Sequence, residues 1–162
     1  MLNRRSKKTE GGTEGCGELR ARALCLLARR EHTRREITEK LNPHAQDAAD
    51  IETVLDELTE EGLLSDARTA QAILNSRIGR QGPLKIRQAL QKHGVPNDLL
   101  AQTIQAARAG ELQAARAVWG KKFNERPSSA EEQARQGRYL QNRGFSPAVI
   151  RQVLKSDAES DD

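Results

Sequence analysis

One pattern of apolar residues occurs three times along the chain, and this repetition constrains the fold more than any other feature. Ile37 and Leu41 in the first copy correspond to Ile86 and Leu90, 49 residues later. A further step of 50 residues leads from Leu90 to Leu140. Self-similarity over a step of this length is typical of proteins in which one supersecondary unit is stacked on its neighbours.

The apolar residues within each copy recur every three or four positions. This spacing indicates amphipathic helices, and no segment alternates as a half-buried strand does. A Gly-apolar pair, Gly94-Val95, recurs 50 residues later as Gly144-Phe145, which indicates the same helix-ending turn in two copies. The sequence therefore predicts an all-α fold of three tandem three-helix repeats, in an elongated, curved array because each repeat contacts mainly its neighbours. We expect helices at residues 18–30, 34–41, 47–61, 67–78, 83–92, 97–109, 111–123, 129–142 and 147–155.

Capping residues mark several of these helix ends. The segment from Thr33 to Glu36 fits a capping box, and so does the segment from Ser128 to Glu131. Two further helices are expected to begin with proline in the first helical position, where the missing amide proton costs nothing. Those prolines are Pro83 and Pro147. Left-handed glycine caps are expected at Gly62, Gly94, Gly110 and Gly144.

Charge is unevenly distributed, although the formal net charge of the whole chain is only +4. This asymmetry is typical of proteins that bind a polyanion or a partner presenting both signs, and a solvated mixed surface is the alternative. The predicted segments and their net charges are a disordered basic arm at 1–17 (+2), repeat 1 at 18–64 (−4), repeat 2 at 65–110 (+5), repeat 3 at 111–155 (+5) and a disordered acidic tail at 156–162 (−4).

The sequence offers no catalytic, metal-binding or cofactor-binding constellation. Its histidines, His32, His44 and His93, lack the spacing of metal ligands, and no glycine-rich phosphate loop follows a strand. The two cysteines, Cys16 and Cys25, form neither a CxxC pair nor a disulfide framework, and Cys25 is expected to be a small buried hydrophobe. The chain is therefore predicted to be a binding protein and not an enzyme.

All four aromatic residues lie in the third repeat, at positions that belong to apolar helix faces. We interpret them as core residues and not as a platform for stacking nucleobases. Because each large ring can bury about 150–250 Å², the third repeat is expected to be the best packed. The residues are Trp119, Phe123, Tyr139 and Phe145.

Basic residues gather in the second and third repeats, and they are the candidate binding residues. Equivalent placement in two repeats would give a basic stripe along one side of the array, with Arg135 and Arg138 on one helix face. Phosphate groups or an acidic protein groove are the natural partners of such a stripe. We expect weak direct binding of nucleic acid at most. The candidates are Arg77, Arg80, Lys85, Arg87, Lys92, Lys121, Lys122, Arg126, Arg135, Arg138 and Arg143.

The apolar runs are too short to anchor the chain in a membrane. The longest, at residues 23–28, falls far short of the roughly 20 residues needed to span a bilayer. Polar and basic residues follow Met1-Leu2, which does not match a secretory signal. We therefore expect a cytoplasmic monomer that makes no membrane contact.

Four stretches covering about residues 18–155 resemble the RecX regulatory family. They are Ala23-Leu24-Cys25-Leu26-Leu27-Ala28-Arg29-Arg30-Glu31-His32-Thr33, Gly62-Leu63-Leu64-Ser65-Asp66-Ala67-Arg68-Thr69-Ala70, Gly82-Pro83-x-x-Ile86-x-x-x-Leu90-x-x-x-Gly94-Val95 and Leu140-x-x-Arg143-Gly144-Phe145-Ser146. The resemblance implies three tandem three-helix repeats. It also implies a protein that lies in the groove of the RecA–single-strand DNA filament. There it would inhibit filament growth, strand exchange, the ATPase and the coprotease activity, and so act in recombination, DNA repair and the SOS response.

Two other functions remain open from the residues alone. One is a helix-turn-helix DNA-binding module acting without RecA, against which stands the acidic helix at 47–61, because that helix cannot approach phosphates. The other is a helical-repeat adaptor for a different acidic or helical partner. The same acidic helix is interpreted as a solvated face, with docking onto a basic partner as the alternative.

Overall fold

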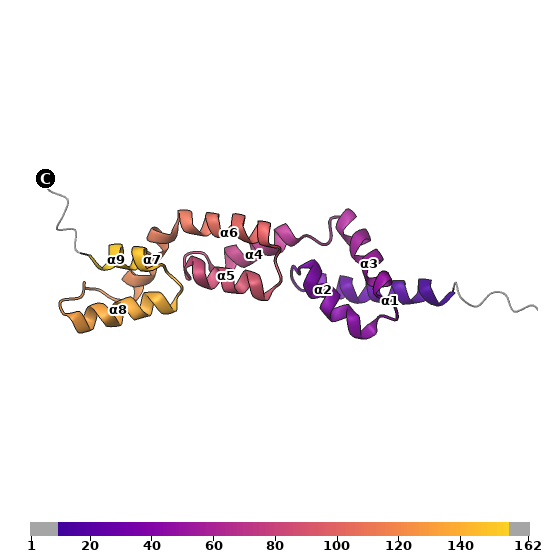
Figure 1. The fold of residues 1–162 in the computed structure, drawn as a ribbon, viewed down its shortest axis with the longest axis horizontal. Helices are drawn as coiled ribbons and strands as arrows, with labels where there is room; N and C mark the ends of the chain where they lie inside the picture. The colour runs from indigo at the N-terminus through magenta and orange to yellow at the C-terminus, as the bar shows by residue number, and fades with distance from the viewer. Residues whose placement is uncertain (1–9, 156–162) are drawn as a thin grey trace, which may run out of the picture. The chain divides into compact units, whose positions relative to one another are not determined.

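The computed structural model describes residues 10–155, and in that range every regular element is a helix (Figure 1). The all-α fold class is therefore confirmed, and the helix bounds agree with the expected ranges to within a residue everywhere except at the first helix. The elements are α1 (Glu10–Leu27), α2 (Arg34–Leu41), the short 3-10 helix η1 (Asn42–His44), α3 (Ala48–Glu60), α4 (Asp66–Arg77), α5 (Pro83–Lys92), α6 (Asn97–Ala109), α7 (Glu111–Lys122), α8 (Ala130–Asn142) and α9 (Pro147–Leu154). Among these residues, no helix has both the length and the apolar character needed to cross a membrane.

The first helix differs most from the prediction, because α1 begins at Glu10 and not at residue 18. Residues 10–17 are helical where a disordered arm was expected. Cys16 packs against the apolar cluster of the first repeat, and its Sγ lies 3.5 Å from Asp50 Oδ1. These contacts stabilise the part of the helix that precedes Leu19. Residues 1–9 of the expected arm and the expected tail at 156–162 lie outside the described residues.

Several helix ends lie at capping residues predicted from the sequence. Thr33 and Glu36 form the complete capping box at the start of α2. The second predicted box is wrong, because Ser129 is the N-cap of α8 and accepts a hydrogen bond from the Glu132 amide, whereas the Glu132 carboxylate accepts from the amide of Ser128 and not from that of Ser129. Pro83 begins α5 and Pro147 begins α9, as expected.

Three of the four expected glycine caps are left-handed, with φ of 74° at Gly62, 70° at Gly94 and 86° at Gly144. The prediction for Gly110 is wrong, because its φ is −108°. Gly110 is the single residue between α6 and α7, so the chain turns directly from one helix into the next.

Contacts divide the chain into two compact units. The first runs to Thr69 and also takes in His93–Val95; the second comprises Ala70–Lys92 and the residues from Pro96 onward. In the first unit, α1 packs mainly against α3. Its buried cluster is formed by Leu19, Ala23, Ile37, Leu41, Ile51, Val54, Leu55, Leu58 and Leu64.

The prediction that Cys25 is buried is wrong, because Cys25 lies on the outer face of α1. Leu19 and Ala23 are buried on one face of α1, four residues apart. Cys25 lies on another face and is exposed, and the neighbouring Leu24 is 36% exposed. A helix that packs mainly on one side leaves such apolar residues open to solvent.

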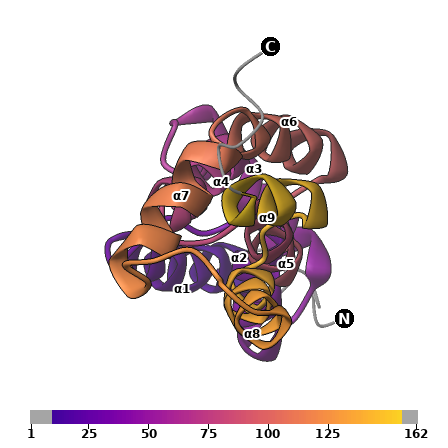
Figure 2. The ribbon, with the colours of Figure 1, turned by 90° about the vertical axis from the view of Figure 1, so that its left-hand side faces the viewer.

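In the second unit, α9 packs against both α7 and α8 (Figure 2). The shared cluster is Ala115, Val118, Leu140, Phe145 and Val153. Among the four aromatic residues of this repeat, only Phe145 is fully buried, and the other three are half-buried. The buried cluster of the first repeat is larger, with nine residues, and the expectation that the third repeat is the best packed stays a prediction.

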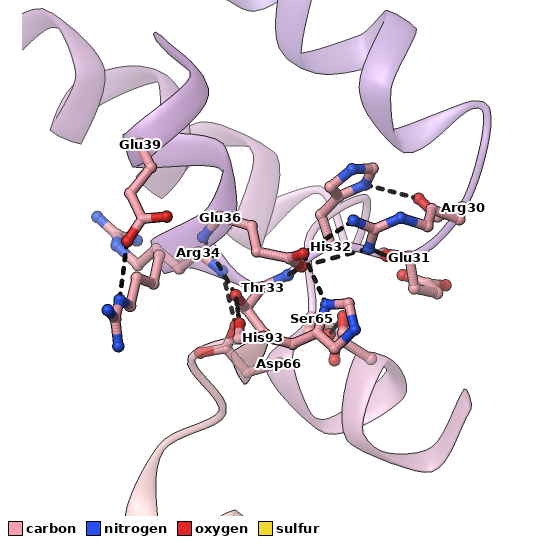
Figure 3. A network of polar contacts seen from close by, with 12 residues as sticks. Arg30, Glu31, His32, Thr33, Arg34, Glu36, Glu39, Ser65, Asp66 and His93 are labelled. Atoms are coloured by element: carbon pink, nitrogen blue, oxygen red, sulfur yellow. Dashed lines mark hydrogen bonds and ion pairs between the residues drawn. The ribbon is translucent and has the colours of Figure 1, made fainter. Parts of the chain in front are cut away.

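Within the first unit, the start of α2 contacts the residues that follow α5 in the chain. Thr33 Oγ1 donates a hydrogen bond of 2.5 Å to the carbonyl of His93, and a Cβ atom on Gly94 would lie 2.5 Å from Arg35 Cδ. The Glu36 carboxylate lies between Arg30 and His93: its Oε1 is 2.8 Å from Arg30 Nη2 and 2.8 Å from His93 Nδ1 (Figure 3). We call this group the Glu36 junction.

Within the second unit, the start of α5 meets the turn after α8 in an equivalent way. The Gly82 amide donates to the Arg143 carbonyl at 2.8 Å, and the Leu84 amide donates to the Gly144 carbonyl at 3.1 Å. A Cβ atom on Gly82 would collide with the Gly144 carbonyl, and one on Gly144 would lie 2.6 Å from the Lys85 amide nitrogen. We call this contact the Gly82 junction.

The two junctions are copies of one contact. Gly82 lies 49 residues after Thr33, and Arg143 lies 50 residues after His93. In each copy, the first residues of one middle helix donate to a carbonyl at the end of the next middle helix. The sequence repeat is therefore a repeat of helix-end contacts as well as of apolar positions.

Replacing Gly82 with alanine should destabilise the protein by about 2–3 kcal/mol, because the added methyl group forces the α5 and α8 ends apart. Urea unfolding followed by circular dichroism measures the change. Gly120→Ala is the matched control, since a Cβ there meets nothing within 4 Å and alanine favours a helix by up to about 1 kcal/mol. Equal stability of the two variants would contradict the close backbone contact.

Glu36→Gln tests the other junction. Burial alone would raise the pKa of Glu36, but hydrogen bonds from Arg30, His93 and the Thr33 amide outweigh it and lower the pKa to about 2. Because the folded pKa lies below the ordinary value of 4.5, the ionised carboxylate stabilises the fold above pH 4.5, and this contribution is lost as the pH falls towards 2. We expect Glu36→Gln to cost about 1–3 kcal/mol near neutral pH, where a buried charged hydrogen-bond acceptor is lost.

The pH profile separates this effect from a general loss of helix stability. The difference in unfolding free energy between wild type and Glu36→Gln should shrink steadily from pH 5 to pH 2. Glu39→Gln removes an exposed carboxylate from the same helix and should change stability by less than about 0.5 kcal/mol. A difference between wild type and Glu36→Gln that stays constant over that pH range would argue against an ionised, strongly paired Glu36.

Candidate partner-binding surface

Two of the three histidines, His32 and His93, make contacts that stabilise the fold. His32 is buried, its Nδ1 lies 3.0 Å from the Arg30 carbonyl, and burial lowers its pKa. His93 pairs with Glu36, and His44 is exposed at the end of η1. In the described part of the chain, no group of three or more His, Cys, Asp or Glu residues could hold a metal ion.

All eleven predicted basic residues fall within the second unit. Nine of them are exposed, whereas Arg77 and Arg87 are half-buried. Arg77 Nη1 donates to Gln81 Oε1 at 3.0 Å, and its Nε is buried without a hydrogen-bond partner among the described residues. The Arg77 side chain therefore contacts the loop between α4 and α5 more than it contacts solvent.

A row of alternating cationic and aromatic side chains runs along α8. Arg135, Tyr139 and Arg143 are four residues apart, so they lie on one helix face. The Arg135 guanidinium lies 5.9 Å from the centre of the Phe123 ring, and the Arg143 guanidinium lies 5.1 Å from that of Tyr139. The two rings meet edge to face with centres 5.3 Å apart. We call these four residues the α8 row; cation–π contact holds its guanidinium groups in place.

Two shallow depressions flank α8. One, of about 370 Å³, is lined by Lys122, Arg126 and Arg135, together with carboxylates of Glu125 and Glu132. The other, of about 340 Å³, is lined by Arg138 and by residues of α9, including Arg151. Arg135 and Arg138 thus border different depressions, and their expected place on one helix face stays a prediction.

The loop between α7 and α8 is fixed by a buried amide that the sequence analysis missed. Gln136 is 3% exposed, accepts a hydrogen bond of 2.8 Å from Trp119 Nε1, and donates one of 3.2 Å to the Glu125 carbonyl. Glu132 accepts from the Ser128 amide at 2.8 Å, and this hydrogen bond lowers the pKa of Glu132. A glutamine four residues before the apolar Leu140 was the available signal.

The Gly82 junction brings more of the candidates together. It joins the loop that carries Arg80 to the turn that carries Arg143, and the stem of Lys85 lies against Gly144. Lys92 is the exception, since it is the last residue of α5 and lies at the opposite end of that helix from the junction. The structure thus groups Arg80, Lys85 and Arg143 but leaves Lys92 apart.

These features define a class of protein: an all-helical repeat protein that works by binding, with an exposed basic surface on its second unit. Within that class, three profiles of one family match successive parts of the chain. They describe the first three-helix domain of RecX at residues 20–58, the second at 65–104 and the third at 109–154. The chain belongs to the RecX family.

Individual relatives agree with this assignment. The chain is 46% identical to the regulatory protein RecX of Leptothrix cholodnii, over 88% of its own length and 92% of that protein. It is 39% identical to the regulatory protein RecX of Ralstonia nicotianae, over 89% and 91%. A crystal structure of RecX from Lactobacillus salivarius has the same fold, with a TM-score of 0.77 at 20% identity over 87% of this chain and 95% of that one.

Family membership confirms the resemblance seen in the sequence and the three three-helix domains. It also makes the chain a regulatory protein of the RecA recombinase and not an enzyme. The repeat boundaries at 18–64, 65–110 and 111–155, the elongated, curved arrangement and the eleven basic residues stay predictions.

Gln136→Leu should destabilise the second unit by about 1–3 kcal/mol, because it leaves the Trp119 indole N–H and the Glu125 carbonyl without partners. Trp119 is the single tryptophan of the chain, so its fluorescence reports directly on this loop. We expect shifted emission in the folded state and a lower urea midpoint. Gln133→Leu, at an exposed position of the same helix, should stay within about 0.5 kcal/mol of wild type. Equal stability and equal Trp119 emission in the two variants would show that the Gln136 amide does not fix this loop.

Proposed function

We propose that this protein binds the RecA–single-strand DNA filament in its groove and inhibits RecA. Inhibition would cover filament growth, strand exchange, the ATPase and the coprotease activity. The protein would act in the cytoplasm as a monomer, and occupation of the groove would suffice, since the proposal requires no chemical step. Membership of the RecX family is the observation that carries this proposal.

The surface we assign to the filament is the α8 row together with the residues around the Gly82 junction. Arg135 and Arg143 are exposed and held over aromatic rings, so less side-chain freedom is lost when they bind an anion. Arg80 and Lys85 extend the same positive surface onto the second repeat. Phosphates or carboxylates lining a groove would be complementary to it.

Direct contact with single-strand DNA is a second candidate function, favoured by one observation. Phe123 and Tyr139 are half-buried and not fully buried, and the depression beside Phe123 holds Lys122 and Arg126. Partly exposed rings beside cations can stack nucleobases and hold phosphates. Binding of an oligonucleotide without RecA, with a steep dependence on salt, would support this candidate.

Reversing the charge of Arg135 and Arg143 together should weaken inhibition of RecA, so that at least about ten times more protein is needed for half-inhibition. Strand exchange and RecA ATPase assays at stoichiometric and lower amounts measure this. Arg77 is unsuitable for such a test because its Nε is buried, so a substitution there would disturb folding first.

Arg108→Glu with Arg116→Glu is the matched control, because both arginines are exposed in the second unit and the change in net charge is the same. The control should inhibit like wild type. If both double variants inhibit equally, the α8 row is not the contact surface. If the wild-type protein has no effect on RecA at stoichiometric addition, the proposed function itself fails.

A further inference from the structure

The first unit contains a groove that the proposed function does not use. It has a volume of about 490 Å³ and lies between α1 and the end of α2 with η1. Its floor is mostly apolar and is formed by Ala21, Cys25, Leu26 and Leu41. Cys25 and Ala21 are exposed, so the floor is open to solvent. An apolar depression of this size can accept one large apolar side chain.

The rim of this groove is cationic, although the first repeat as a whole is acidic. Arg22, Arg29, Lys40 and His44 line it, and the sole carboxylate among its lining residues is Glu18. Glu18 is paired with Arg22 at 2.8 Å. Among residues 15–155, whose side chains the structure describes, Arg29, Lys40 and His44 have no side-chain hydrogen-bond or ion-pair partner. Within that range, three basic side chains therefore border the apolar floor without a paired carboxylate.

The acidic residues of the same repeat are gathered elsewhere. Carboxylates of α3 and of its C-cap residue bind Arg34 and Arg20: Asp56 lies 2.7 Å from Arg34 Nη2, and the C-cap Glu61 lies 2.7 Å from Arg20 Nη2. The repeat thus separates its charges, with the unpaired cations beside the apolar groove. A ligand complementary to the groove carries carboxylates around an apolar centre.

We propose that this groove binds an acidic peptide segment of a protein partner, one bulky apolar side chain of which enters between α1 and α2. The carboxylates of the segment would pair with Arg29, Lys40 and His44. The groove follows α1 from Glu18 to Arg29, which is about 16 Å at the helical rise, and about five extended residues cover that distance.

A nucleic-acid strand fits this groove less well than such a peptide. A strand carries a phosphate on every nucleotide, so it would bring a continuous negative charge to a repeat whose net charge is −4. Phosphates also gain nothing from an apolar floor. A short peptide places its charge locally and supplies the apolar side chain that the floor requires.

Cys25 provides a reporter inside the groove. It is exposed on the floor, whereas Cys16 is half-buried on the same helix and does not line the groove. The probe is a synthetic peptide of Asp and Glu with one central Phe. It should slow alkylation of Cys25 by N-ethylmaleimide at least about fivefold in the full-length protein, as mapped by mass spectrometry. Alkylation of Cys16 should not change.

Variants separate the apolar and the electrostatic parts of the site. Ala21→Trp fills the floor without changing charge, and Arg29→Glu with Lys40→Glu reverses the rim; each should weaken binding of the labelled peptide at least about tenfold by fluorescence anisotropy. Arg108→Glu with Arg116→Glu should bind like wild type. Replacing the central Phe of the probe with Ala should weaken binding to wild type to a similar extent.

Three results would overturn the proposal. They are unchanged alkylation of Cys25 at saturating probe, equal binding by the rim and control variants, and equal protection of Cys25 by an oligothymidylate of the same charge. None of them bears on the α8 row, whose test is the RecA assay. Because the alkylation assay uses the wild-type chain, the proposal remains testable even if a groove variant fails to fold.

Discussion

The hydrogen bonds between helix ends are the contacts on which the rest of this structure depends. Three-helix repeats of this size bury little surface alone, and each helix end leaves unpaired backbone groups. At the Gly82 junction the amides at the start of α5 meet the carbonyls at the end of α8, so one contact satisfies both ends. The approach is so close that only glycine fits at Gly82. The geometry of the proposed binding surface depends on this contact, because the junction places Arg143 beside the loop that carries Arg80.

The distribution of charge follows from the same architecture. The repeats share their buried positions and their helix-end contacts, and these leave the outer faces free to differ. In the second unit the outer face of α8 carries Arg135 and Arg143, each over an aromatic ring. In the first unit the cations of α1 and α2 surround an apolar groove, and the carboxylates of α3 face other arginines. One scaffold thus presents two positive surfaces of different chemistry.

The sequence predicted the helices well because periodicity and capping are local properties. The Thr33 capping box, the prolines of α5 and α9, and three left-handed glycines all follow from neighbouring residues. Contacts between residues far apart in the sequence could be predicted less well. No residue near Gln136 in the sequence shows that it joins Trp119 to Glu125. Likewise, no residue near Glu36 indicates its contact with His93, 57 residues away. The same limit applies to Arg135 and Arg138, because the depressions that they border also involve residues outside α8.

The Glu36 carboxylate takes part in two sets of contacts. Its carboxylate completes the capping box of α2 through the Thr33 amide, and it also binds His93 beyond the end of α5. Fraying of α2 and opening of the contact between repeats are therefore one event with a shared free energy, and not two independent ones. A force or ligand that pulls His93 away would loosen α2, and any agent that stabilises the start of α2 would hold the contact closed. The capping box thus couples the local stability of α2 to its contact with the residues that follow α5.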